Sequence, residues 1–436
     1  MFRKPTRRQF LQTSAAAGAG FWLSGSLNAA PPRMQQEKIQ FACVGVGGKG
    51  ASDTQDASRN GNVVAICDID ETTLDKAALR FPNAKKFFDY REMLAEMGDQ
   101  IDAVTVSTPD HTHAVAAISA MKMGKHCFCQ KPLTRSVWEA RRMREVAQEY
   151  GVCTMMGNQG TANSNLRVGA KLIQDGLLGK ISAVHVWTDR PIWDQGVERP
   201  AAETAPKTVH WNEWLGPAPQ TPYSAKYHPF AWRGFWDFGT GALGDMACHT
   251  LNMPFMGLDL RDPLSVKAES SGHNKVSFPA RSSIVFEFGE RNGRAPLSLT
   301  WYDGGNRPPA ELLEGSEQGM RRSGSLVIGE KGKLYSPGDY GGQFEVFGGV
   351  KRPEKTEIER SPGHFSEWVR HINGGQAAVS NFVDYAGPLT ETVLLGNLAV
   401  WSGEKVEWDT ESMTPKGKPE LEKIVRPTYR DGYDIS

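Results

Sequence analysis

The chain has 436 residues, which is more than one ordinary domain holds and enough for two or three hydrophobic cores. Fifty basic residues balance fifty acidic ones, so the charge excludes a strongly basic nucleic-acid binder and gives no argument for an anionic membrane partner. Most of the six cysteines lie in apolar, strand-like runs, which favours small buried side chains over a disulfide framework or a zinc site.

The N-terminus has the outline of an export signal. Paired arginines, Arg7 and Arg8, precede Phe-Leu, an Ala/Gly-rich stretch and small residues ahead of a Pro-Pro. This order resembles a twin-arginine signal, so we expect residues 1–30 to be a signal peptide and the mature protein to be periplasmic or otherwise extracytoplasmic. A basic tail without targeting function is the alternative. Since twin-arginine export moves folded proteins, the interpretation also predicts a cofactor that is loaded before export and held tightly.

The next stretch is typical of a dinucleotide-binding βαβ unit. An apolar strand over 39–44 leads into a G-x-G-x-x-G turn, a polar helical run and a second apolar strand that ends at Asp68. The glycines expected to surround a pyrophosphate are Gly45, Gly47, Gly48 and Gly50. Asp68 is expected to accept hydrogen bonds from the adenosine ribose, which favours NAD over NADP as the cofactor.

Strands and helices continue to alternate as far as residue 160. Strands are predicted at 101–107, 126–129 and 152–156, and helices at 72–80, 91–97, 114–123 and 138–150. Loops beyond the carboxyl ends of parallel strands collect ligand contacts. The further residues expected to contact the cofactor are Thr108, Pro109, His113, Gln130 and Asn158.

The succession of motifs resembles one family. The glycine fingerprint, then T-P-x-x-x-H from Thr108, G-K-H from Gly124 and K-P-L from Lys131 is similar to the Gfo/Idh/MocA family of sugar and polyol oxidoreductases. The resemblance implies that Lys131 is a catalytic residue that touches substrate and that Pro132 follows a cis peptide bond. One position departs from the family pattern, because Gln130 stands where a glutamate is usual.

The second half begins with an aromatic stretch. A helix at 166–175 and an alternating strand at 181–187 are followed, up to residue 238, by sequence that is poor in helix signals, and residues 187–236 hold half of the twelve tryptophans. Aromatic faces pack on the C–H faces of sugar rings, so Trp232 and Trp236 are expected to bind substrate. The competing interpretation is a long loop that uses its aromatics as its own core.

A glycine-rich lead-in then opens a helix that carries Asp245 and His249. Residues four apart share a helix face, so the two side chains are expected to project together. The pair resembles the family's catalytic Asp/His pair, which implies that His249 exchanges a proton with a substrate hydroxyl and that Asp245 binds substrate or tunes the imidazole. Asn252 stands where many relatives have aspartate, a change expected to affect hydroxyl selection.

The remainder reads as a succession of short strands. They are predicted at 264–269, 282–288, 296–301, 324–328 and 332–335, with helices at 364–372 and 389–401. The expected architecture is an α/β protein with a Rossmann domain at 38–160 and a substrate-binding α/β domain with a predominantly antiparallel open sheet at 161–436.

These predictions converge on an NAD(P)-dependent enzyme that oxidises or reduces a ring hydroxyl of a sugar, polyol or glycoside, with Lys131, Asp245 and His249 contacting the substrate. We expect a homo-oligomer without metal. Three alternatives stay open: a redox-neutral NAD-dependent glycoside hydrolase, an oxidoreductase that couples two sugars through bound cofactor, and a non-catalytic sugar sensor that binds the cofactor.

Overall fold

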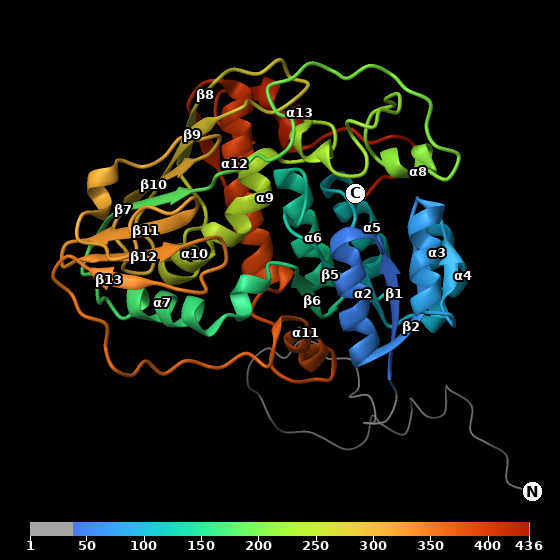
Figure 1. Cartoon of the computed structure of the whole chain (residues 1–436), viewed down its shortest axis with the longest axis horizontal. Helices are drawn as coiled ribbons and strands as arrows, with labels where there is room; N and C mark the ends of the chain where they lie inside the picture. Colours follow the sequence, from blue (N-terminus) through green and yellow to red (C-terminus); the bar gives the residue numbers. More distant parts are fainter. Residues whose placement is uncertain (1–37, 436) are drawn as a thin grey trace, which may run out of the picture. The chain divides into compact units, whose positions relative to one another are not determined.

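The computed structural model describes residues 38–435, which lie in one compact unit built around two β-sheets (Figure 1). The predicted signal peptide lies outside the described residues. In the described part of the chain no helix is both long and apolar enough to cross a membrane.

The first sheet is the predicted Rossmann sheet. Its six strands run in the order β3-β2-β1-β4-β5-β6, and every pair in it is parallel. The strands are β1 (Ile39–Val44), β2 (Gly61–Cys67), β3 (Lys85–Phe87), β4 (Ala103–Val106), β5 (His126–Cys129) and β6 (Thr154–Met156). The helices that alternate with them are α2 (Gly48–Asn60), α3 (Glu71–Arg80), α4 (Tyr90–Met97), α5 (Asp110–Lys122) and α6 (Val137–Glu149). The strand order reverses between β1 and β4, which is where a doubly wound sheet binds its ligand.

The second sheet has nine strands in the order β13-β12-β11-β7-β10-β9-β8-β14-β15. Only the β7–β10 pair is parallel, so the predicted predominantly antiparallel sheet is confirmed. Its strands are β7 (Ile181–Trp187), β8 (Ser265–Ser270), β9 (Ser282–Phe288), β10 (Leu297–Tyr302), β11 (Gly324–Gly329), β12 (Lys333–Pro337), β13 (Glu345–Phe347), β14 (Val406–Asp409) and β15 (Thr414–Pro415). The sequence analysis missed the last three, which are too short to show a period.

Helices α9 (Gly241–Thr250) and α12 (Gly387–Ser402) lie between the two sheets (Figure 1). Helix α12 is buried over nearly its whole length, and its Glu391 pairs with Arg141 and Arg144 of α6. The largest hydrophobic cluster includes side chains of both sheets, so the Rossmann sheet and the second sheet share one core. Helices α7 (Ser164–Gln174), α10 (Asn252–Leu258), α11 (His364–Ile372) and α13 (Glu422–Val425) complete the architecture.

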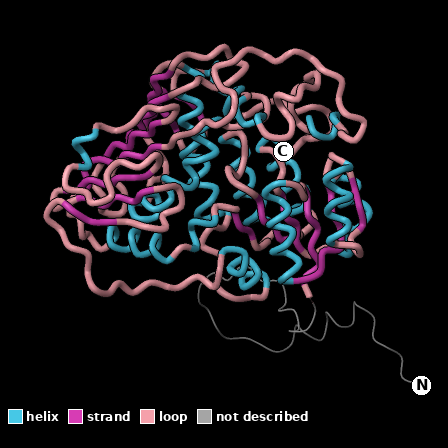
Figure 2. Tube along the Cα trace, viewed as in Figure 1, coloured by secondary structure: helices cyan, strands magenta, loops and turns pink. Residues whose placement is uncertain are grey.

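Residues 188–240, here called the aromatic segment, connect β7 to α9 almost entirely as loop (Figure 2). The segment contains a short α-helix, α8 (Trp211–Leu215), and one turn of 3-10 helix, Ala231–Gly234. Its rings pack on one another: Trp211 stacks on Trp214 at 4.4 Å, and Tyr227 meets Phe238 edge to face at 5.0 Å. Most of its aromatic side chains therefore form a small core of their own.

Candidate active site

The glycine-rich turn between β1 and α2 has the shape that a dinucleotide pyrophosphate requires. Gly45 has φ +76°, a conformation that favours glycine. A Cβ on Gly50 would lie 1.9 Å from the Gly45 carbonyl oxygen, so α2 packs against the turn only with glycine there. A Cβ on Gly48 would meet nothing within 4 Å, which leaves open space over the turn at the N-terminus of α2. The turn fits a pyrophosphate.

Asp68 lies at the end of β2, beside this turn. Its carboxylate accepts hydrogen bonds from the Val46 N–H at 2.9 Å and the Asp70 N–H at 3.1 Å. Burial raises the pKa of Asp68 above its ordinary value, while these N–H groups oppose the rise. An acid at this position is the one that binds the ribose hydroxyls of NAD.

His113 links two loops at the carboxyl edge of the sheet. Its ring nitrogens lie 2.8 Å from the carbonyl oxygens of Thr108 and Pro132, and its side chain is 1% exposed. With both nitrogens facing backbone, the ring has no polar atom left for a cofactor. The structure therefore places His113 as a positioning residue, whereas Thr108 and Pro109 remain partly exposed in the loop after β4.

Gln130 is buried and faces a carboxylate that the sequence analysis missed. Its Nε2 donates to Asp53 Oδ2 at 2.8 Å. Asp53 lies on α2, is 1% exposed, and also accepts from Ser107 Oγ at 2.8 Å and from Lys49. The position before Lys131 thus lacks its own carboxylate, but a negative charge reaches it from the first Rossmann helix.

Asn158 follows β6 and is fully buried. Its Oδ1 accepts from the Ser380 hydroxyl, but its Nδ2 has no hydrogen-bond partner among residues 38–435. A buried amide donor without a partner costs about 1–3 kcal/mol.

Lys131, Asp245 and Arg233 form a charged cluster between the two sheets. Lys131 Nζ donates to Asp245 Oδ1 at 2.7 Å and to the Asp245 carbonyl oxygen at 2.9 Å, and Arg233 Nε reaches Asp245 Oδ1 at 3.3 Å. Burial alone would raise the pKa of Asp245, but the two cations lower it to about 2. The Lys131–Pro132 peptide bond is cis, as the family resemblance implies.

His249 lies one helical turn beyond Asp245 on α9 and is 4% exposed. Burial lowers the pKa of its imidazole to about 3, with Lys131 adding to the effect, so the ring is neutral at pH 7. Its Nδ1 has no hydrogen-bond partner in the described part of the chain. The exposed Tyr340, from the loop between β12 and β13, meets the ring edge to face at 4.8 Å.

A second buried carboxyl, Asp110, lies at the start of α5. It accepts a hydrogen bond from Thr240 Oγ1 at 2.6 Å, and burial raises its pKa to about 7. Lys131, Arg233 and Asp245 all act electrostatically on Asp110. The charge of the site therefore changes near neutral pH.

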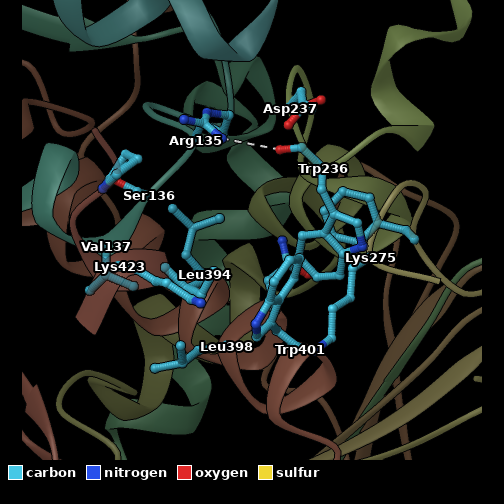
Figure 3. Close-up of a pocket in the computed structure, with 15 residues that line it drawn as sticks. Arg135, Ser136, Val137, Trp236, Asp237, Lys275, Leu394, Leu398, Trp401 and Lys423 are labelled. Carbon is cyan, nitrogen blue, oxygen red and sulfur yellow. Dashed lines mark hydrogen bonds between the residues drawn. The ribbon is translucent and has the colours of Figure 1, made fainter. Parts of the chain in front are cut away.

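The two tryptophans expected to bind substrate lie apart. Trp232 is 5% exposed and packs under the Arg233 guanidinium, whose Cζ lies 4.2 Å from the ring centroid, so it supports the cluster from behind. Trp236 stacks on Phe278 at 3.6 Å and lines a different cavity, of about 140 Å³, together with Trp401 (Figure 3). That cavity is not lined by Lys131, Asp245 or His249.

Asn252 is also not available to a substrate. Its Nδ2 donates to Thr161 Oγ1 at 2.8 Å, its Oδ1 accepts from the Tyr385 hydroxyl, and the side chain is fully buried. Both polar ends of this side chain are thus occupied within the protein, and an effect of Asn252 on hydroxyl selection stays a prediction.

Chemically, the cluster combines a lysine donor, a second cation, one ionised carboxylate and a neutral imidazole with a free nitrogen. Two cations against one carboxylate leave a positive excess that stabilises negative charge on a bound oxygen. A neutral histidine can take a proton from a hydroxyl or return it. Gln130, the neighbour of Lys131 in the chain, donates to Asp53 of α2 at 2.8 Å, so the loop that carries Lys131 is joined to the helix that follows the dinucleotide turn.

Two protein-family models match parts of the chain. A family model described as an oxidoreductase family with an NAD-binding Rossmann fold matches residues 39–158, and the model of that family's C-terminal α/β domain matches residues 162–291. The cofactor predicted from the glycine-rich turn and Asp68 is thus confirmed as NAD.

Curated relatives with different activities are similar to the chain. It is 25% identical to a levoglucosan dehydrogenase of Pseudarthrobacter phenanthrenivorans over 178 residues, which are 41% of this chain and 38% of the relative. It is 30% identical to an alpha-N-acetylgalactosaminidase of Shewanella oneidensis over 206 residues, which are 40% of this chain and 44% of the relative. The chain thus spans about two fifths of the length of these relatives.

Among solved structures, the WlbA dehydrogenase of Chromobacterium violaceum, in complex with NADH and UDP-GlcNAcA, superposes with a TM-score of 0.64 at 19% identity. The match covers 88% of this chain and 99% of that one. At this identity the likeness shows the fold.

Proposed function

The chain belongs to the Gfo/Idh/MocA family of oxidoreductases, and from this premise we propose that it oxidises or reduces a ring hydroxyl of a sugar or glycoside with NAD. The observation that carries the proposal is the Lys131–Asp245–Arg233 cluster beside the neutral His249, at the edge of the sheet where the glycine-rich turn lies. A purely structural ion pair would not need a buried imidazole with an unpartnered nitrogen next to it.

Bound NAD supplies hydride acceptance from the carbon that carries the reacting hydroxyl. The turn at Gly45–Gly50 and Asp68 hold the cofactor. Lys131 donates to the reacting oxygen and stabilises the charge that develops there. His249 takes the hydroxyl proton on its imidazole, because the ring is neutral at pH 7.

Asp245 has two roles in this proposal. It remains ionised, with a pKa of about 2, and so fixes the Lys131 ammonium. Its oxygens also accept hydrogen bonds, so it can receive a neighbouring substrate hydroxyl. Arg233 keeps the net charge of the cluster positive when Asp245 is ionised. Tyr340 offers an exposed ring in contact with His249, a surface suited to the C–H face of a sugar.

The second candidate is redox-neutral glycoside hydrolysis, in which oxidation is followed by elimination, hydration and re-reduction on the same bound NAD. Its support is the 30% identity to the alpha-N-acetylgalactosaminidase. Both reactions require the same lysine, histidine and cofactor, so the residues do not separate them.

One experiment separates the two candidates. The purified protein is incubated with a panel of free sugars and aryl glycosides, while nicotinamide absorbance and aglycone release are followed together. Net NADH formation without cleavage supports the dehydrogenase, and aglycone release without net NADH supports the hydrolase. If no compound gives net NADH or aglycone, and cells with the Lys131→Ala protein behave as cells with the wild type, the chain is a cofactor-binding sensor.

Export through a twin-arginine signal is the accompanying proposal for location. It rests on the Arg7–Arg8 pair and the apolar stretch behind it. An exported enzyme meets no free NAD pool, so we also propose that its cofactor remains bound and is recycled in place. A fusion of residues 1–37 to a reporter that is exported in a wild-type strain, but retained when Arg7 and Arg8 are replaced by lysine, tests the location.

A further inference from the structure

The aromatic segment does more than connect β7 to α9: its middle part returns to the Rossmann domain and binds the loop after β2. The Glu71 N–H donates to the Thr208 carbonyl oxygen at 2.9 Å, and the His210 N–H donates to the Ile69 carbonyl oxygen at 2.9 Å. Asp70 and Val209 form an antiparallel β-bridge between these two bonds. The aromatic segment is therefore hydrogen-bonded to the residues that directly follow Asp68.

Side chains reinforce this attachment. His210 Nε2 lies 3.1 Å from Glu71 Oε1, and its ring stacks on Phe88 with centroids 4.1 Å apart and planes inclined by 17°. Ile69 packs against the small aromatic core of the segment. One histidine thus joins the segment to the loop after β2 and to the residue after β3.

A second attachment reaches the first turn of α5, directly after the loop that follows β4. The His111 N–H donates to the Phe238 carbonyl oxygen at 3.2 Å. The two ring nitrogens of His111 lie 3.1 Å from the same oxygen and 2.8 Å from the Trp214 carbonyl oxygen. The histidine is fully buried and contacts the rings of both Trp214 and Phe238.

These two attachments flank the region where the adenosine half of the cofactor is expected. Asp68, which we expect to bind the adenosine ribose, lies next to Ile69, and the loop from Thr108 leads directly to His111. In a doubly wound sheet the adenosine half of the cofactor lies at the carboxyl ends of the strands that these loops follow. A segment fixed to the loop after β2 and to the first turn of α5 closes the outer side of the adenosine site.

We propose that the aromatic segment is the retaining wall of the adenosine site and that NAD leaves only when the segment detaches from the loop after β2. This inference rests on the proposed NAD-dependent function and supplies a structural basis for a resident cofactor. Detachment must break backbone hydrogen bonds, a β-bridge, a His–Glu contact and a ring stack together, so it is rare compared with ordinary loop motion. Binding that requires a rare opening is slow in both directions.

The test compares dissociation rates of NADH. Full-length wild type, His210→Ala and Glu71→Gln proteins are loaded with NADH and mixed with an excess of an NADH-consuming enzyme, while the fluorescence of bound nicotinamide is followed. We expect at least tenfold faster release from His210→Ala and a smaller acceleration from Glu71→Gln, which removes only the charge. The milder variant keeps the test valid if the alanine variant folds poorly.

His185→Ala is the matched control. This half-buried histidine on β7 also stacks on an aromatic ring, Tyr302, and contacts its hydroxyl at 3.0 Å, but it lies within the second sheet. Its release rate should equal that of wild type. Release from both segment variants within twofold of the wild-type rate, with unchanged circular dichroism, would overturn the inference.

Failure of the proposed function gives a different result. The wall is judged by the ratio of variant to wild-type release rates, which is measurable even in a protein that turns over no sugar. If the wild type releases NADH rapidly and the variants release it faster still, the cofactor is not resident, but the aromatic segment is still the retaining wall of the adenosine site. A wild type that does not bind NADH would overturn both.

Discussion

Replacement of Lys131 by methionine is the most informative single change in the site. Methionine keeps the length of the apolar stem and removes the ammonium, which lies 2.7 Å from Asp245 Oδ1. Loss of one preorganised donor to a reacting oxygen costs roughly 3–4 kcal/mol of transition-state stabilisation, or 10²- to 10³-fold in rate. Asp245 then retains only Arg233, at 3.3 Å, and its pKa rises from about 2 because burial is no longer offset by two cations.

Stability should respond with a defined sign. Asp245 has a folded-state pKa below its ordinary 3.8, so its contribution to the free energy of unfolding is fully present above pH 4 and is lost as the pH falls toward 2. Lys131→Met reduces that contribution, and we expect a loss of about 1–3 kcal/mol at pH 7 that shrinks on acidification. Urea unfolding at pH 7 and pH 3 measures both values.

The assay for Lys131→Met is single-turnover reduction of bound NAD by substrate, with NAD affinity measured separately. We expect the rate to fall at least 10²-fold while NAD binding changes less than threefold. Lys275→Met is the control, because that lysine lines the other cavity, with its ammonium 5.7 Å from the centroid of the Trp401 ring. A rate within threefold of wild type would refute the assigned role of Lys131.

Three further changes test other parts of the site. His249→Gln should lower the rate of hydride transfer by roughly 10²- to 10⁴-fold in stopped-flow absorbance, without weakening NAD binding; an unchanged rate would remove His249 from proton transfer. Asp110→Asn should stabilise the protein above pH 7. The folded form keeps the Asp110 proton up to a pKa of about 7, whereas the unfolded chain releases it near 3.8. The free energy of unfolding of the wild type therefore falls as the pH rises through this window, by at most roughly 4 kcal/mol. Equal melting temperatures of the two proteins at pH 8 would contradict this. Gln130→Glu sets a second carboxylate against Asp53 and should destabilise the fold by about 2 kcal/mol in urea unfolding, with recovery in the double variant that also carries Asp53→Asn. If the Gln130→Glu protein is as stable as the wild type, the carboxylate introduced at position 130 does not face the charge of Asp53.

The fold was largely predictable because its signals are local. Buried parallel strands read as apolar runs, and the glycine turn before α2 has a spacing dictated by close approach of the backbone. The meeting of Asp245 and His249 on one helix face follows from helical periodicity alone. The short strands β13 and β15 carry no such period, although each pairs with the strand just before it in the chain. Strand β14 is also short, and its pairing with β8 joins residues far apart in the sequence.

The partners within the site were less predictable. Arg233 comes from the aromatic segment and reaches Asp245 only after the chain has folded back, and Asp53 reaches Gln130 across the sheet. Trp236 and Trp232 were expected to bind substrate because they lie in an aromatic run. Such a run predicts that the rings pack against a partner, but only tertiary packing decides whether that partner is a sugar or another side chain. His113 satisfied the family motif, yet its ring serves the backbone of two loops.

The central claim is that Lys131, Asp245 and His249 carry out hydride chemistry on a sugar hydroxyl with NAD. It is tested most directly by mixing NAD-loaded full-length protein, without free NAD, with each compound of a sugar and glycoside panel and following the nicotinamide signal in the first turnover. The account predicts that at least one compound reduces bound NAD with a stoichiometry approaching one per protein, transiently if hydrolysis follows, and that the His249→Gln protein lacks this phase. A protein that binds NAD and sugar, but forms no reduced nicotinamide even transiently with any compound, would contradict it.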